Sequence, residues 1–91
     1  MNFEYDRAKS RTNSLKHGIS LEQATKLWHL PSVEIEARFA GEERRMIIGK
    51  LNHKLYSCVF TVREDKIRLI SARRSRSSEE EVYNEQIQED N

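Results

Sequence analysis

Four apolar runs between residues 33 and 74 follow one another with links of four residues or fewer. In the first run, apolar and charged residues alternate from Val33 to Phe39, which is the period of a half-buried strand. Three further strands are predicted over residues 44–50, 55–63 and 66–74. A parallel crossover needs a dozen or more residues, so links this short can only be hairpins. The sequence therefore predicts an antiparallel meander, with turns at Ala40-Gly41, Leu51-Asn52-His53 and Glu64-Asp65.

The N-terminal third is predicted to form a short strand and two helices. The strand covers residues 3–5, and Asp6 is a candidate N-cap for a first helix that ends at Gly18. Ser20 and Gln23 have the spacing of a capping box, and apolar residues then recur at helical spacing. A second helix therefore follows the first almost at once.

Residues 77–91 form an acidic terminal segment with six acidic side chains and no basic one. Ser77 or Ser78 is the predicted N-cap, and three glutamates follow where they complement the helix dipole. This helix has a thin apolar stripe, so it either packs weakly on the sheet or stays mobile until a partner covers it. The order β-α-α-β-β-β-β-α predicts an α+β fold, with two N-terminal helices and one C-terminal helix segregated from an antiparallel sheet of four or five strands.

Length and composition restrict the class of protein. The 91 residues with 36% apolar content fit one compact domain over residues 1–91. No run approaches the ~18 apolar residues of a membrane span, and the N-terminus lacks the apolar region of a signal peptide. Cys58 is the only cysteine and is expected as a buried apolar residue. We therefore expect a cytoplasmic protein without membrane contact.

The net charge of +1 conceals a strong asymmetry. Residues 1–76 hold all sixteen Lys and Arg against nine acidic residues, which gives this part a net charge of +7. A basic body favours a polyanionic partner, whereas the acidic tail can cover the basic surface or project into water. Composition alone does not choose between these two arrangements of the tail.

Four arginines and no acidic residue occur in RLISARRSRS, residues 68–77. In a regular strand, Arg73 shares a face with Ile67 and Leu69, and Arg74 lies on the opposite face. Both can be solvated strand ends. However, guanidinium groups gathered without carboxylates in the segment repel one another unless they share an anion, which a phosphate would supply. We therefore predict that at least one of the pair binds phosphate.

Arg44 and Arg45 are weaker candidates on a neighbouring predicted strand. They can add positive charge to the same side of the sheet, but ion pairs with Glu42 and Glu43 explain them equally well.

Lys16 and His17 stand at the C-terminal end of the first helix, where the helix dipole stabilises cationic side chains. Histidine is the commonest proton carrier near neutral pH, although His17 can also be an ordinary residue beside the helix cap. Tyr83 has little to bury on the polar terminal helix, so its phenol is a candidate contact for a ligand or partner. The histidines and Cys58 lack metal-ligand spacing, and no P-loop or serine hydrolase pattern occurs, so no metal or cofactor is expected.

Three blocks of the chain resemble a known family. FEYDRAKSRTNSLKHGISLEQA, GEERRMIIG and IRLISARR are similar, in this order, to blocks of the BrnT-like toxin family, and Glu79 with Tyr83 matches a following Glu-x-x-x-Tyr. The resemblance implies a RelE-like endoribonuclease toxin of a bacterial type II toxin-antitoxin system that cleaves RNA without a metal. It also implies neutralisation by a BrnA-like ribbon-helix-helix antitoxin, through which operator DNA is bound.

The same resemblance implies roles for individual residues. Arg73 and Arg74 match the Ala-Arg-Arg block and would stabilise charge on the reacting phosphate, while Lys16 and His17 match the Lys-His-Gly turn. The expected catalytic residues are thus Arg73, Arg74 and His17, and the expected RNA contacts are Lys16, Arg44, Arg45, Arg68 and Tyr83.

The chain departs from the family pattern after Ala-Arg-Arg. Serines at 75, 77 and 78 and Glu80 stand where the family commonly carries basic residues. An alternative function is therefore a catalytically weak or inactive module whose basic face chiefly binds the antitoxin. A DNA-binding repressor is less favoured, because the arginines gather on strands and no helix-turn-helix carries them.

Overall fold

The computed structural model describes residues 1–39 and 42–89. Its elements in chain order are β1 (Asn2–Glu4), α1 (Arg7–His17), α2 (Leu21–Ala24), the 3-10 helix η1 (Thr25–His29), β2 (Ser32–Phe39), β3 (Glu42–Leu51), β4 (Lys54–Arg63), β5 (Lys66–Arg74) and α3 (Ser77–Glu89). The predicted α+β fold is confirmed, and each predicted strand and helix has its counterpart. The turn predicted at Ala40-Gly41 lies outside the described residues.

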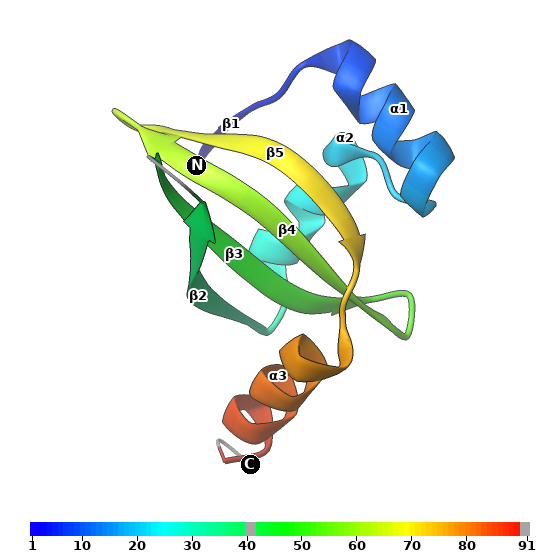
Figure 1. Cartoon of the computed structure of the whole chain (residues 1–91), viewed down its shortest axis with the longest axis vertical. Coiled ribbons are helices and arrows are strands. Elements are labelled where there is room, and N and C mark those ends of the chain that lie inside the picture. The colour runs from blue at the N-terminus through cyan, green and yellow to red at the C-terminus, as the bar shows by residue number, and fades with distance from the viewer. Residues whose placement is uncertain (40–41, 90–91) are drawn as a thin grey trace.

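One five-stranded sheet with the order β1-β5-β4-β3-β2 forms the centre of the molecule (Figure 1). Strands β2 to β5 are the predicted antiparallel meander. The prediction of a purely antiparallel sheet is wrong at one pair, because β1 runs parallel to β5, with Phe3 beside Ile67. No hairpin links these two strands, since both helical segments and three strands separate them in the chain. Their relative direction therefore has no local signal in the sequence.

Both faces of the sheet carry an apolar core. On one face, residues of α2 and η1 such as Leu21 and Leu27 pack against Cys58 and Phe60 of β4. On the other face, α3 packs against β2 and β3. Its Tyr83 is only 6% exposed and belongs to the same apolar cluster as Val33, Met46, Ile48, Leu55 and Val59. The expectation that Tyr83 has little to bury is wrong, because α3 closes a second core.

Helix α1 is attached to the sheet mainly through polar contacts. Its ends are as predicted, since Asp6 accepts a hydrogen bond from the Lys9 N–H and Gly18 adopts a left-handed conformation with a φ of 73°. The buried residues of the helix are Ser10 and Asn13, whereas Leu15 is 85% exposed. An apolar stripe therefore does not orient this helix.

Asn13 completes the outer edge of β5 beyond the end of β1. Strand β1 pairs with β5 only as far as Arg68, so the backbone of Ala72 has no neighbouring strand on that side. The Asn13 amide donates to the Ala72 carbonyl at 2.7 Å and accepts from the Ala72 N–H at 3.2 Å. It also donates to the Ile19 carbonyl at 2.8 Å. One side chain thus satisfies backbone groups that would otherwise be buried and unpaired.

A β-bulge in β5 changes the faces of its last residues. Val59 is opposite Ser71 but Phe60 is opposite Leu69, so Ile70 is an extra residue in β5. The predicted regular alternation is therefore wrong beyond Ile70. Leu69 and Ala72 lie in the same core beneath α1 and α2. Consequently Arg73 lies on the face of α3 and Arg74 on the face of α1, the reverse of the simple pattern.

None of the described helices is long and apolar enough to span a membrane.

Replacing Asn13 with alanine should lower the free energy of unfolding by about 2–4 kcal/mol, because buried backbone groups at residues 19 and 72 lose their partners. Urea denaturation monitored by circular dichroism measures the loss. Thr12→Ala is the control, since the Thr12 hydroxyl bonds only within the exposed side of α1 and should cost less than about 1 kcal/mol. Equal losses in both variants would contradict the assigned role of Asn13.

Candidate functional site at the end of strand β5

Three chain segments that carry basic side chains meet at one end of the sheet. They are the C-terminal end of α1, the β3–β4 hairpin and the end of β5, and Figure 1 shows all three on the same side of the molecule. The Ser75 N–H donates to the Leu55 carbonyl at 2.9 Å, and Asn13 joins α1 to β5. We call this region the basic end and define it by the exposed residues Lys16, His17, Lys50, His53, Lys54, Arg74 and Arg76.

Arg73 has a carboxylate partner outside the segment that suggested phosphate binding. Its guanidinium donates to both oxygens of Glu79 on α3, each at 2.8 Å, and also to the Arg74 carbonyl at 3.2 Å. The side chain is 23% exposed. The hydrogen bond to Glu79 raises the pKa of Arg73. The charge of Arg73 is therefore neutralised within the protein, in the bidentate geometry that arginine and carboxylate favour.

Glu79 is the centre of a small hydrogen-bond network. Its Oε1 also accepts from the Ser57 hydroxyl at 2.8 Å and from the Arg76 N–H at 2.9 Å, and the hydroxyls of Ser57 and Ser75 are 2.8 Å apart. Burial by itself raises the pKa of Glu79, but the hydrogen bonds from Arg73, Arg76 and Ser57 outweigh it and lower the pKa to about 2. The network attaches the first turn of α3 to the ends of β4 and β5.

The start of α3 differs from the predicted one. The Arg76 carbonyl accepts the first helical hydrogen bond, from the Glu80 N–H at 2.9 Å, so Arg76 rather than Ser77 or Ser78 occupies the N-cap position. Glu79, three residues later, accepts from the Arg76 N–H as in half of a capping box. The helix thus begins beside the carboxylate that also binds Arg73.

Arg74 is the exposed arginine of the pair. Its guanidinium carbon lies 5.8 Å from the centre of the Tyr56 ring, its neighbour across the strands. Within the described part of the chain, Arg74 has no salt bridge to a carboxylate. It is therefore the arginine that remains available to an external anion.

His17 and Lys16 reach the same end of the sheet as Arg74. Helix α1 begins shortly after Glu4, which is paired with Arg68, and reaches Ala72 at Asn13, so it runs alongside β5 in the same direction. His17 lies one turn beyond Asn13 on the same side of the helix, and Arg74 lies two residues beyond Ala72 on the same face of the strand. The side chains of His17 and Arg74 are both exposed at this end of the sheet.

The structure does not bring the remaining predicted arginines to the basic end. Arg68 pairs with Glu4 at 3.5 Å and stands about 20 Å along β5 from Arg74. Arg45 pairs with Glu34 on the neighbouring strand β2 at 3.4 Å. Arg44 is partly buried opposite Ala37. RNA contacts by these three arginines remain predictions.

Tyr83 of α3 is buried in the second core, and a contact between RNA and Tyr83 remains a prediction. Cys58 is buried as predicted, and burial raises the pKa of its thiol to about 12, so it is not a reactive nucleophile. The described residues contain no group of three or more His, Cys, Asp and Glu side chains that could hold a metal ion.

Sequence reasoning missed several residues of this region. Lys50, His53 and Lys54 lie in or beside the predicted hairpin between β3 and β4. Pairing β4 with β5 places this hairpin next to Arg74, so their proximity could have been predicted from the sequence. Glu79 could have been predicted to cap the start of α3, because it follows Arg76 by three residues. No local pattern indicated its partner Arg73.

The exposed cations of the basic end form a surface of the kind that binds phosphate-containing polymers. The family model described as the ribonuclease toxin BrnT of type II toxin-antitoxin systems matches residues 5–79. The chain therefore belongs to this family of ribonuclease toxins. RNA as substrate and an antitoxin as partner follow from that membership. The match includes the basic end and Glu79 but ends before Tyr83. No match was found among curated proteins.

The stability of the protein should depend on pH through Glu79. Its folded-state pKa of about 2 lies below the ordinary value of 4.5, so its contribution is fully present above about pH 5 and is lost as the pH falls toward 2. We expect wild type to be about 2–3 kcal/mol more stable than Glu79→Gln at neutral pH, with the difference shrinking in acid. Urea denaturation across this pH range measures both curves.

Glu85→Gln is the matched control, because Glu85 is an exposed glutamate on the same helix. Its stability curve should run parallel to that of wild type. If the Glu79 variant also ran parallel to wild type from neutral to acidic pH, the network would not be the source of the pH dependence.

Proposed function

We propose that the protein is a metal-independent endoribonuclease toxin that cleaves RNA at the basic end. The observation that carries this proposal is the separation of the two arginines, since Arg73 is neutralised by Glu79 while Arg74 is exposed beside the end of α1. A cluster of exposed cations favours a polyanion. Membership in a ribonuclease toxin family identifies that polyanion as RNA.

The chemistry that suits these residues is attack of a ribose 2′-hydroxyl on the adjacent phosphate. The hydroxyl gives up a proton, the phosphate passes through a phosphorane with growing negative charge, and the 5′-oxygen leaves with a proton. The products are a 2′,3′-cyclic phosphate and a 5′-hydroxyl end. Arg74 and Lys16 would stabilise the phosphorane oxygens, and His17 would carry a proton to or from the reacting oxygens.

Arg73 has a different part in this proposal. Its two hydrogen bonds to Glu79 already occupy the face of the guanidinium that would bind a phosphate. It therefore supports the site by fixing the end of β5 against α3 rather than by binding the scissile phosphate. The expectation that the two arginines share the catalytic role is thereby refined to Arg74 alone.

We further propose a BrnA-like ribbon-helix-helix protein as the antitoxin, with operator DNA bound only through it, and a RelE-like single domain that works in the cytoplasm. The antitoxin would neutralise the toxin by covering the exposed cations of the basic end. The alternative function, an inactive module that only binds the antitoxin, draws support from Ser77, Ser78 and Glu80. Compared with the basic residues common in the family, they reduce the positive charge beside Arg76, where an RNA strand would lie.

Arg74→Ala should lower the rate of RNA cleavage by about 10²-fold or more, because it removes the principal stabiliser of the phosphorane. Purified protein is incubated with RNA in EDTA, and cleavage is followed on denaturing gels. The thermal midpoint should stay near that of wild type, since Arg74 is exposed, whereas Arg73→Ala should lower it by breaking the Glu79 network. Wild-type cleavage rates in Arg74→Ala would remove Arg74 from the proposed site.

Expression of the toxin without its antitoxin should arrest growth and degrade cellular RNA. Expression together with a ribbon-helix-helix protein encoded beside it should restore both. RNA integrity gels and growth curves measure the two effects, and the Arg74→Ala variant serves as the inactive control. Normal growth with intact RNA in the absence of the antitoxin would favour the inactive module instead.

A further inference from the structure

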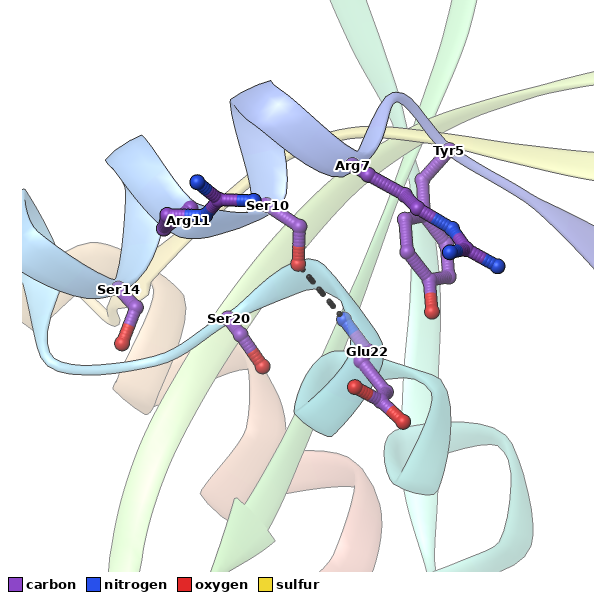
Figure 2. A pocket seen from close by; sticks show the side chains of 7 residues that line it. All are labelled: Tyr5, Arg7, Ser10, Arg11, Ser14, Ser20 and Glu22. Carbon is purple, nitrogen blue, oxygen red and sulfur yellow. Dashed lines mark hydrogen bonds between the residues drawn. The ribbon is translucent and has the colours of Figure 1, made fainter.

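An open pocket of about 510 Å³ lies between α1 and the start of α2. It is lined by Tyr5, Arg7, Ser10, Arg11, Ser14, Ser20 and Glu22. Figure 2 shows Ser10 between the two arginines on α1, with Ser20 and Glu22 across from them. None of these residues belongs to the basic end, and the proposed reaction uses none of them.

Two arginines dominate the charge of this pocket. Arg7 and Arg11 are four residues apart, so their side chains lie on neighbouring positions of the same helix face. Both are exposed, and neither guanidinium has a salt bridge or hydrogen-bond partner among the described residues. Like charges at this spacing destabilise a helix unless an anion lies between them. The pocket therefore carries two cations that are unpaired within the described protein.

Hydroxyl groups complete the lining. The Ser10 hydroxyl accepts from the backbone N–H groups of Leu21 and Glu22, at 2.9 and 3.3 Å, and the Ser20 hydroxyl accepts from the Gln23 N–H at 3.0 Å. These bonds fix the oxygen positions and use the oxygens as acceptors, so the hydroxyl protons remain available to an anion. A group with several acceptor oxygens, such as a phosphate, fits guanidinium and hydroxyl donors of this kind.

The position of the pocket connects it with the basic end. Arg11 precedes His17 by six residues on α1, an axial rise of about 9 Å. Six residues also turn the helix face by about 120°, so an RNA strand that is cleaved beside His17 reaches Arg11 and Arg7 by passing partly around α1 within a few nucleotides. The pocket is also open rather than enclosed, which suits a continuous polymer better than a small ligand buried on most sides.

We propose that this pocket is a subsite for a backbone phosphate of the RNA, separate from the phosphate that is cleaved. The inference rests on the proposed function, because it takes the basic end as the place of cleavage. Arg7 and Arg11 bind the phosphate, and Glu22, the single acidic residue of the lining, weakens that binding by repulsion. Contacts of this type position a strand without reading its bases.

The test measures the binding of 2′-O-methyl RNA oligonucleotides, which lack the attacking hydroxyl and so are bound without being cleaved. Fluorescence anisotropy over a range of salt concentrations compares wild type with Arg7→Gln/Arg11→Gln. The double variant should bind an oligonucleotide of about ten nucleotides roughly 10-fold more weakly at low salt, with a salt slope smaller by about one or two. Glu22→Gln should bind more tightly than wild type.

The matched control is Arg63→Gln/Lys66→Gln, which removes two exposed charges at the β4–β5 hairpin, at the other end of β5 from Arg74. If this control lost as much affinity as the α1 double variant, the effect would be general electrostatics and the subsite would be refuted. Thermal midpoints should stay close to that of wild type in all variants, because none of the changed side chains is buried and a pair of like charges on a helix costs only about 0.2–0.5 kcal/mol.

Length dependence separates the subsite from the cleavage site. A dinucleotide cannot reach both places, so wild type and the α1 double variant should bind it equally. A difference with the dinucleotide would mean that Arg7 and Arg11 bind the scissile phosphate, which overturns the subsite. Absence of any RNA binding or cleavage by wild type would instead overturn the proposed function, and the subsite with it.

Discussion

The bonds between Asn13 and Ala72 are the contacts on which the arrangement of the site depends. Helix α1 has no apolar stripe directed at the sheet, and its leucine faces water. The amide of Asn13 nevertheless satisfies both backbone groups of Ala72 where β1 has already ended. Because hydrogen bonds need short distances and favourable angles, Asn13 can bond both groups only when it lies beside Ala72. The helix is therefore held at a defined position along β5. His17 and Arg74 therefore lie at the same end of the sheet, although 56 residues separate them in the chain.

The β-bulge at Ile70 gives the two adjacent arginines different surroundings. The extra residue at Ile70 turns Arg73 toward α3, where the Glu79 carboxylate accepts hydrogen bonds from its Nη1 and Nη2. It leaves Arg74 beside Tyr56 in contact with water. One cation thereby becomes part of the framework and the other remains available. The Glu79 carboxylate also accepts from the Arg76 N–H at the start of α3, so the helix that closes the second core is attached to the end of β5.

Much of the fold could be predicted because its signals are local. The caps at Asp6, Gly18 and Ser20 and the two described hairpin links, at residues 52–53 and 64–65, depend on neighbouring residues, and the structure confirms them. The parallel pairing of β1, the bulge at Ile70 and the burial of Tyr83 depend on distant partners. A pattern of period two cannot reveal an inserted residue, and a thin apolar stripe cannot reveal how much surface the opposite sheet face offers.

The sequence by itself determined the order of the elements, the meander, the excess of positive charge and, through three blocks of motif, the ribonuclease toxin family that the family comparison confirms. It also placed Arg73 and Arg74 on opposite faces of one strand. Only the tertiary structure decided which arginine is neutralised, since Glu79 reaches Arg73 by the folding of α3 onto the sheet. It likewise gathered Lys16, Lys54 and Arg74 at one end, because distance between charges is set by packing and not by chain separation.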